Sequence, residues 1–518
     1  MRPTYDLCLL VCALIKNPMF GLSGLDLAIV GGYFLIVMII GMRFGKKGGT
    51  THEFIVGGRS IPTWAVICSI IATEISAVTF LAVPGASFAG NLNYLQFGVG
   101  SIVARFVIAA LFIGLYYKFN CLSIYEFLAH RFGSSTHYTA SGFFIVTRVL
   151  ASGVRLLVAA NGLAVFFNIP VEATVIVFTI TTAAYTFSGG IKAVVATDVV
   201  QAGVFVGSVI AVLIFFQFSI GWETIWPMAQ KAGHLELFHW APKDPHVLMS
   251  WLGDPNLFFL AFVNGLVMTT AALGVDQDLA QRMLTCTTAN NSKRSVIISG
   301  LVGVPIAGLF LLAGVGLFAF FQLYPDPAMP AKADDVFPYF IATYLPSGMR
   351  GLLLAGILAA AMSSLSSTMG SLSSSAVMDF YKPLFGKNKT DAQLVLLSRI
   401  LIAVFGLVLA VVAIAFKDVQ GFLWWSFKVG GITYGSMLGV FLLGVLTKNR
   451  GHDGWNIFSM LISAAVCTLL LILLELGKIT LAWSWLIIIG TTITFVLSAL
   501  GQTSKGKTDS MADSMKTP

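Results

Sequence analysis

Residues 62–86, PTWAVICSIIATEISAVTFLAVPGA, decide how this chain folds. The stretch is apolar and long enough to cross a bilayer as a helix, which takes about 20 residues. Its middle carries Glu74 between the hydroxyls of Thr73 and Ser76. A carboxylate at mid-membrane is costly unless it faces a partner or a water-filled cavity. The stretch predicts a membrane helix that is interrupted near Glu74 and lines a polar site. The alternative is a continuous helix whose hydroxyls bond to its own carbonyls.

The whole chain shares this apolar character. Of its 518 residues, 57% are hydrophobic and 10% are charged, whereas an average soluble domain has about 25% charged residues. Mean hydropathy is +0.88. These values exclude a soluble enzyme and favour one membrane domain without an enzymatic role. The net charge of +8 arises from short basic clusters between apolar runs, so membrane topology explains it better than binding of nucleic acid.

Cysteine and histidine usage limits the chemistry. The six cysteines are scattered and mostly lie in or beside apolar segments, which predicts free thiols rather than a disulfide framework. All seven histidines fall between the apolar runs, so a metal centre buried in the membrane has no imidazole ligand. We therefore expect no cofactor and no metal apart from a coupling ion.

Thirteen apolar segments are predicted to span the membrane as helices, because they are longer than the tilted strands of a barrel. They cover 25–42, 62–86, 95–117, 139–167, 170–187, 194–218, 257–281, 296–321, 351–377, 395–415, 423–446, 455–476 and 479–500.

The basic residues between these spans predict the orientation. With the first span running from outside to inside, eighteen Lys and Arg residues fall on the inner side and eight on the outer side. This bias favours a multi-pass protein of the cell membrane with its N-terminus outside and its C-terminus in the cytoplasm. Residues 1–24 form an N-terminal extension, with translation starting at Met1 or Met19, and residues 501–518 form a disordered cytoplasmic tail.

The ninth span, 351–377, is as unusual as the second. At 3.6 residues per turn, Ala360, Ser363 and Ser364 share one face, and Ser366 and Ser367 continue the line of hydroxyls by one turn. Neutral oxygens in two tiers suit a hard cation such as sodium. We therefore expect span nine to be interrupted like span two. A packing seam of small residues explains the same pattern equally well.

Five basic residues fall inside predicted spans: Arg105, Arg148, Arg155, Arg399 and Lys428. Arg399 and Lys428 lie near span ends, where the side chain can reach the interface. Arg148 and Arg155 flank the small residues 151–153 deep in the fourth span, where a functional and a structural role are equally plausible.

Four motifs together resemble the sodium:solute symporter family over about residues 25–500. They are Ile71–Ser76 with Thr79-Phe80; Ser188-Gly189-Gly190 with Thr197–Gln201; Asp276-Gln277 with Gln281-Arg282; and Ala360–Ser367 leading to Met378–Lys382. The resemblance implies an all-α integral membrane protein with the leucine-transporter fold and about 13 transmembrane helices. Two inverted repeats of five helices would cover 62–218 and 257–446, joined by an extracellular loop at 219–256. A leading helix and loop at 25–61 and two trailing helices at 447–500 complete the plan.

The resemblance also implies two cation sites. The sodium site shared by the family corresponds to the carbonyls of Ala72, Ile75 and Ala360 and the hydroxyls of Ser363 and Ser364. A second sodium site, known in sialic acid carriers, corresponds to Asp198, Ser363, Ser366 and Ser367. The hypothesis is therefore one or two sodium ions per transport cycle. The other partners implied are a small-molecule solute and the lipid bilayer, and the oligomeric state is left open.

By position in the family, the solute site comprises Glu74, Ser76, Thr79, Tyr94, Gln96, Arg155 (or Arg148) and Asp276. Ser76 and Thr79 resemble the hydroxyls with which sialic acid carriers hold a carboxylate. Glu74 and Asp276 depart from that pattern, and two acids repel an anion unless each is protonated or paired with an arginine. We therefore expect uptake of a polyhydroxylated, sugar-like solute.

Several alternatives to this function remain. The first is sodium-coupled uptake of an organic anion, such as sialic acid or a carboxylate, or of an amino acid. A proton-coupled carrier using Glu74 and a transporter-like sensor are alternatives from other classes.

Overall fold

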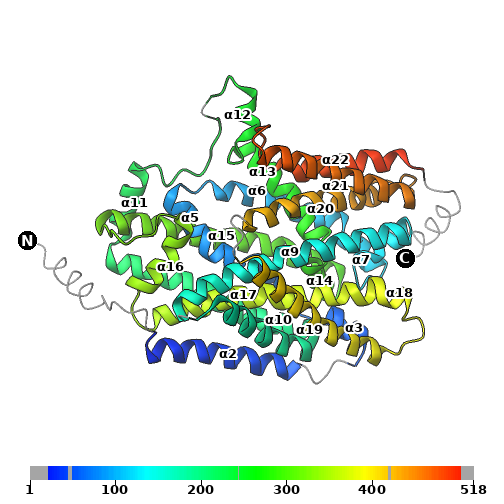
Figure 1. The fold of residues 1–518 in the computed structure, drawn as a ribbon, viewed down its shortest axis with the longest axis horizontal. Helices are drawn as coiled ribbons and strands as arrows, with labels where there is room; N and C mark the ends of the chain where they lie inside the picture. Colours follow the sequence, from blue (N-terminus) through cyan, green and yellow to red (C-terminus); the bar gives the residue numbers. More distant parts are fainter. Residues whose placement is uncertain (1–21, 45–48, 168, 243, 418–421, 503–518) are drawn as a thin grey trace, which may run out of the picture.

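The computed structural model describes residues 22–44, 49–167, 169–242, 244–417 and 422–502. Long helices run side by side along the longest axis of the molecule (Figure 1). The described residues contain two isolated bridge contacts and no longer strand. The long helices are α2 (Gly24–Phe44), α6 (Tyr94–Leu111), α9 (Ser134–Phe167), α10 (Val171–Ser219), α13 (Phe258–Gly274), α15 (Ala289–Leu323), α17 (Met349–Ser375), α19 (Asp391–Ala415), α20 (Phe422–Leu446), α21 (Asp453–Glu475) and α22 (Trp485–Leu500).

These helices establish a multi-pass membrane protein. By length and apolar composition, nine helices of the described part can cross a bilayer, and one bent helix pair makes a tenth. The total of thirteen spans, the inverted repeat and the orientation stay predictions. The termini, residues 1–21 and 503–518, lie outside the described residues, as does the choice between Met1 and Met19.

The predicted interruption of span two is confirmed. Helix α4 (Thr63–Glu74) and helix α5 (Ala77–Ala89) meet at a bend of 63°. Between them, Ile75 (φ −84°, ψ 93°) and Ser76 (φ −86°, ψ 171°) are extended, so the main chain leaves the helix for two residues.

The predicted interruption of span nine is wrong. Helix α17 is continuous and lies in the centre of the bundle, where it packs against α4, α5, α9, α10 and α19. Its hydroxyls bond to their own helix: Ser364 donates to the carbonyl of Ala360 and Ser366 to that of Ser363, each at 3.1 Å. Such bonds add to the helical hydrogen bonds without replacing them, so many serines do not break a helix. A π-helical turn, η2 (Ala376–Tyr381), follows.

A second break occurs in span seven, which the apolar pattern does not reveal. Helix α13 ends at Gly274 and helix α14 (Gln277–Met283) begins three residues later. Asp276 is extended (φ −102°, ψ 118°), and its carboxylate accepts a hydrogen bond from the N–H of Asp278 at 2.8 Å. A side chain that caps the next helix makes the break local and stable.

Spans five and six, predicted as separate segments at 170–187 and 194–218, form one helix, α10, with a kink between them. Gly190 has φ 56° and ψ −150°, a conformation that essentially only glycine adopts. A Cβ atom there would lie 2.6 Å from the carbonyl oxygen of Phe54. Glycine is therefore required both by the backbone conformation and by the close approach of helix α3 (Thr51–Val56), which carries Phe54.

Short helices cover both ends of the bundle (Figure 1). One end carries α11 (Trp222–Lys231) and α16 (Ala333–Tyr344), and α12 (Leu248–Gly253) stands out sideways from the bundle. The opposite end carries α3 (Thr51–Val56), η1 (Gly57–Arg59), α7 (Ile113–Lys118), α8 (Glu126–Arg131) and α18 (Lys382–Leu384).

Candidate functional site

The break between α4 and α5 leaves buried carbonyl groups without a partner. The N–H of Ile75 donates to Ile71, and the next backbone bond across the break runs from Phe80 to Ser76, each at 3.0 Å. Among the hydrogen bonds of the described residues, none reaches the carbonyl oxygens of Ala72 or Ile75, although both residues are buried. An unpaired buried carbonyl is costly, and a dehydrated cation can satisfy it.

Of the predicted sodium donors on α17, Ser364 lines a cavity together with Ser76 and Ala77 of this break. Ala360, Ser363 and Ser364 are buried, and α17 packs against both halves of the broken helix. The hydroxyl of Ser364 donates to the carbonyl of Ala360, which leaves its lone pairs available. The hydroxyl of Ser363 donates to Asp198 at 2.7 Å, so Ser363 connects the two predicted cation sites.

The second break differs from the first because tyrosines occupy its carbonyls. The Tyr116 hydroxyl donates to the carbonyl of Gly274, and the Tyr125 hydroxyl donates to that of Val275 at 2.9 Å. These two carbonyls therefore have neutral donors already. The first break is the better cation site of the two.

Five buried charged residues form a continuous chain beside α17. Arg148 bridges Asp276 (2.9 Å) and Asp278 (2.8 Å), and Arg282 bridges Asp278 (3.7 Å) and Asp198 (2.9 Å). Each of these side chains is at most 3% exposed. Buried charges are tolerated when they are paired, and here each carboxylate has an arginine. Three carboxylates against two guanidinium groups leave a formal charge of −1 in this chain.

The predicted second sodium site comprises Asp198, a member of this row of charged residues, and three serines close to it. Asp198 contacts Ser363, and Ser366 donates to the carbonyl of Ser363 at 3.1 Å. Ser367 accepts a hydrogen bond from Arg282 at 2.8 Å. Because Arg282 already pairs with Asp198, a second cation must share that carboxylate with a guanidinium group or replace it.

A cavity of about 10 Å³, enough for about one water molecule, adjoins the first break and combines four polar side chains with apolar walls. This mixed lining is typical of a site for a small solute, which would need a wider cavity than this state offers. It is lined by Ser76, Ala77, Ser152, Arg155, Leu156, Ala361, Ser364 and Leu365. The predicted solute residues Ser76 and Arg155 therefore meet here, together with the predicted sodium donor Ser364.

Arg155 has no partner among the described residues. It lies two helical turns from Arg148 on the same helix, yet no ion pair or hydrogen bond reaches it there. Its buried Nε atom is likewise unpaired. A guanidinium group beside a cavity without a carboxylate of its own is a ready site for an anionic group.

The two carboxylates that the sequence places in the solute site, unlike Arg155, each form an ion pair with an arginine. Glu74 accepts two hydrogen bonds from Arg105 at 2.8 and 2.7 Å, and Arg105 also donates to Ser299 at 2.9 Å. Asp276 is held by Arg148 and caps α14. Neither acid lines the cavity.

Three further predicted solute residues also lie outside the cavity lining. Gln96 donates to the carbonyl of Asn256 at 2.9 Å and accepts from the N–H of His239 at 3.0 Å, so it holds a loop in place. Tyr94 is 46% exposed at the start of α6. Thr79 is half-buried one turn beyond Ser76. Position relative to a break does not by itself tell which side chains face a solute.

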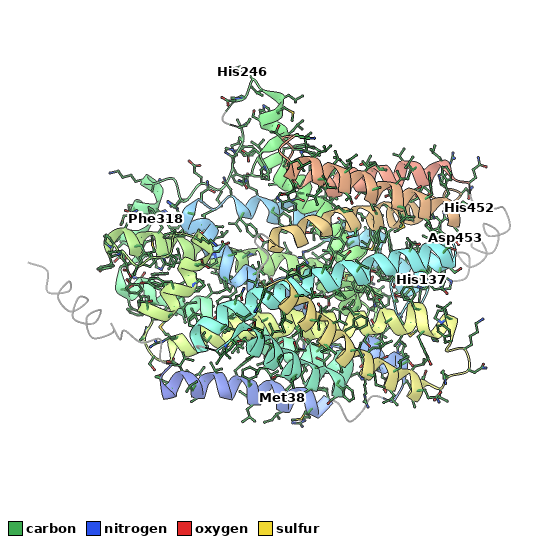
Figure 2. The ribbon with its side chains drawn as sticks, viewed as in Figure 1. Met38, His137, His246, Phe318, His452 and Asp453 are labelled. Atoms are coloured by element: carbon green, nitrogen blue, oxygen red, sulfur yellow. The ribbon has the colours of Figure 1, made fainter. Side chains whose placement is uncertain are left out.

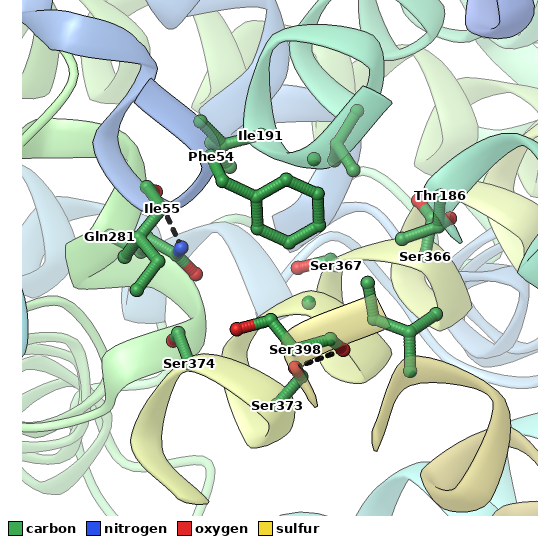
Figure 3. Close-up of a pocket in the computed structure, with 14 residues that line it drawn as sticks. Phe54, Ile55, Thr186, Ile191, Gln281, Ser366, Ser367, Ser373, Ser374 and Ser398 are labelled. Atoms are coloured by element: carbon green, nitrogen blue, oxygen red, sulfur yellow. Dashed lines mark hydrogen bonds between the residues drawn. The ribbon is translucent and has the colours of Figure 1, made fainter. Parts of the chain in front are cut away.

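A second cavity, of about 10 Å³, is lined by residues of α3, α10, α14, α17 and α19. Figure 3 shows Ser366 and Ser367 of α17 facing it, with Phe54 opposite. Gln281 donates to the carbonyl of Ile55 at 2.6 Å and closes one wall. The charged cluster reaches this cavity at Ser367, which accepts a hydrogen bond from Arg282.

Asp379 is the centre of a separate buried cluster toward the end that carries α18. Its carboxylate pairs with His137 at 2.9 Å and accepts hydrogen bonds from Ser123 (3.0 Å) and Ser141 (2.7 Å). The cluster fastens η2 to α9, because His137 and Ser141 lie in the first turns of that helix.

Glu126, in the short helix α8, belongs to the same region. Burial raises the pKa of its carboxyl group to about 7, and the charge of Asp379 adds to the rise. A hydrogen bond from the N–H of Leu122 and the charges of His137 and Lys382 lower the pKa and offset part of this effect. Glu126 therefore binds a proton in the folded protein at a pH where a free glutamate is ionised.

Some residues of the site escaped the sequence analysis. Ser152 lies in the small-residue stretch beside Arg155, and Asp278 lies two residues after Asp276, so both were adjacent to predicted positions. Asp278 could have been found from the requirement that every buried acid have a partner. That requirement would have predicted that each carboxylate pairs with an arginine, but it would not have predicted which arginine each one contacts.

Known proteins resemble this chain in sequence and in fold. The family model of the sodium:solute symporter family matches residues 54–462. The sodium/sialic acid symporter SiaT of Proteus mirabilis is 26% identical over 449 residues, covering 85% of this chain and 88% of that protein. The sodium-coupled monocarboxylate transporter 1 of Mus musculus is 27% identical, covering 83% and 70%. A solved substrate-bound, outward-open Na⁺-coupled sialic acid symporter has a TM-score of 0.82 at 23% identity, covering 93% and 98%.

Proposed function

This chain belongs to the sodium:solute symporter family, and we propose from that membership that it imports a small organic anion together with sodium. The observation that carries the choice of solute is Arg155, a guanidinium group at the cavity without a partner among the described residues. Relatives named as sialic acid and monocarboxylate carriers support the same solute class.

An anion replaces the sugar-like solute expected from the sequence. That expectation required Glu74 and Asp276 to offer free carboxylates to hydroxyl groups. In the fold each carboxylate is held by an arginine, so neither repels an anion strongly and neither is free for a polyol. The remaining charge at the cavity is positive.

The cavity suggests how the anion binds. Arg155 would hold a carboxylate by two parallel hydrogen bonds, and the Ser76 hydroxyl would add a third. Leu156 and Leu365 would contact the apolar part of the solute. Because the apolar walls exclude water, the charge pairing is stronger than it would be at the surface.

Sodium would bind at the five predicted oxygens, beside the solute. Ser364 both lines the cavity and belongs to the predicted sodium site, so one ion would organise the wall against which the solute rests. Solute and sodium then raise each other's affinity by the same factor, as linkage requires. After the bundle rocks, sodium would leave past Asp198 through the second cavity.

The number of sodium ions follows from how Arg282 behaves. Asp198, Ser363, Ser366 and Ser367 supply the oxygens for a second ion, which would displace Arg282 from Asp198. A sodium Hill coefficient of one, together with unchanged coupling in Ser366→Ala, would reduce the proposal to a single ion.

Proton coupling through Glu74 is the less favoured mechanism. The two hydrogen bonds from Arg105 stabilise the ionised carboxylate, so Glu74 is a poor proton carrier in this state. Uptake driven by a pH gradient in sodium-free medium would select that mechanism instead.

The test is uptake into proteoliposomes under an inward sodium gradient, with labelled lactate and sialic acid compared against glucose. We expect uptake of an anion and no sodium-driven glucose uptake. In Arg155→Gln, the KM for the anion should rise about 10- to 100-fold, since a charged hydrogen bond contributes about 1.5–3 kcal/mol. Arg43→Gln, at the exposed end of α2, is the control for removing one positive charge. Sodium-driven glucose uptake, or an unchanged KM in Arg155→Gln, would contradict the proposal.

A further inference from the structure

An arm, residues 244–257, stands out sideways from the bundle between α11 and α13. Figure 1 shows α12 beyond the edge of the helices, and Figure 2 places His246 at its tip. The arm is anchored at its base: the carbonyl of Leu252 accepts hydrogen bonds from the N–H of Ala482 at 3.0 Å and from the indole of Trp485 at 3.1 Å. His239 pairs with Asp254 at 3.0 Å. The arm is therefore held in one orientation.

This arm exposes large apolar side chains. Leu248 is 72% exposed, Val247 51%, Met249 43% and Trp251 39%, and no residue of α12 is buried. Trp240, at the base, is 65% exposed. So many apolar groups on one fixed, projecting element indicate a surface that contacts another apolar phase.

The direction of the arm identifies that phase. The long helices lie along the horizontal axis of Figure 1, so the membrane normal is close to that axis and the arm projects within the membrane plane. It leaves the bundle where α13 and α22 begin. There the centroid of the Trp240 ring lies 4.7 Å from that of the Phe258 ring, and Phe259 is 68% exposed. The base of the arm therefore lies beside an exposed apolar side chain of α13, a helix of the membrane bundle.

We propose that the arm is a membrane anchor that lies in the headgroup region of the adjacent leaflet, with Leu248, Met249 and Trp251 inserted among the lipids. Tryptophan favours this depth because its ring is apolar and its N–H is polar. The Trp251 N–H already donates to the carbonyl of Pro245 at 2.9 Å, so the ring can enter an apolar layer. The sequence of the arm, DPHVLMSWLGDPNL, has two aspartates and no lysine or arginine. Binding therefore rests on apolar burial rather than on anionic lipids.

Site-directed spin labelling of the full chain in proteoliposomes tests this inference. Labels at Leu248→Cys and Met249→Cys are compared with Leu461→Cys, on the lipid-exposed side of α21, and with Gln230→Cys, on exposed α11. The signal of the labelled parent protein is subtracted for its native cysteines. We expect labels on the arm to collide more with oxygen than with a water-soluble nickel complex, at a depth between the two controls. The same depth is expected in phosphatidylcholine vesicles and in vesicles with added anionic lipid.

Two results would overturn the proposal. Nickel accessibility equal to that at Gln230 would place the arm in water. Protection from both reagents with dipolar broadening between labels would place it against a second copy of the chain. Because the labels report depth and not transport, failure here would leave the proposed function untouched.

Discussion

Removing the Ser364 hydroxyl should weaken sodium binding without unfolding the protein. The hydroxyl is one of five predicted sodium ligands and lines the solute cavity beside the first break. Its only hydrogen bond among the described residues is to the carbonyl of Ala360, one turn earlier on the same helix. In Ser364→Ala, α17 keeps its backbone bonds and the cavity gains little volume.

The size of the effect follows from the loss of one charged contact. A hydrogen-bonding group facing an ion contributes about 1.5–3 kcal/mol, so sodium affinity should fall about 10- to 100-fold. Ser371→Ala is the matched control, because that buried serine makes the same kind of bond, to Thr368, farther along α17. Each variant loses one hydrogen bond from a serine hydroxyl to a carbonyl of the same helix. The two variants therefore differ in whether the lost hydroxyl is a predicted sodium ligand.

The assay is the rise in Tm with sodium, titrated against choline at constant ionic strength, which needs no solute. The wild type and Ser371→Ala should show the same midpoint. For Ser364→Ala the midpoint should shift to higher sodium by the factor above. An unshifted midpoint for Ser364→Ala, or an equal shift in both variants, would refute the sodium site between the first break and α17.

Further predictions concern stability. Arg148→Ala leaves the buried Asp276 without an arginine and Asp278 with Arg282 alone, at 3.7 Å. It should cost on the order of 3–5 kcal/mol, read as a lower Tm, whereas a Tm unchanged from wild type would show that the charges are solvated. Because the pKa of Glu126 is raised to about 7, the folded state holds a proton that the unfolded chain releases above about pH 4.5. The contribution of Glu126 to the free energy of unfolding therefore falls by at most about 3 kcal/mol as the pH rises from about 4.5 to 7. Glu126→Gln lacks this dependence, so its Tm should rise relative to that of the wild type between pH 5 and 8. Parallel curves of Tm against pH for the two proteins would contradict this. Gly190→Ala should lose about 1–3 kcal/mol from its positive φ and the clash with α3, while Gly203→Ala, in open space on the same helix, should not; equal Tm values would exclude the strained kink.

The sequence by itself determined the class of the protein and the position of the first break. Hydropathy and helix length are local properties, so the apolar runs predicted the positions of the long helices, whereas the total of thirteen spans stays a prediction. The break at Ile75 and Ser76 was predictable because a carboxylate and hydroxyls within an apolar run need a polar environment.

Only the tertiary structure decided which charged side chains form ion pairs with each other. Glu74 pairs with Arg105, Asp276 with Arg148, and the partners lie far apart in the chain. It also showed that α17 is continuous and that the second break lies before α14. Ion pairing and capping depend on distances set by helix packing, which no local pattern encodes. For that reason the proposed anion site at Arg155 could be argued only from the tertiary structure, in which the neighbouring arginines Arg105 and Arg148 are paired with acids.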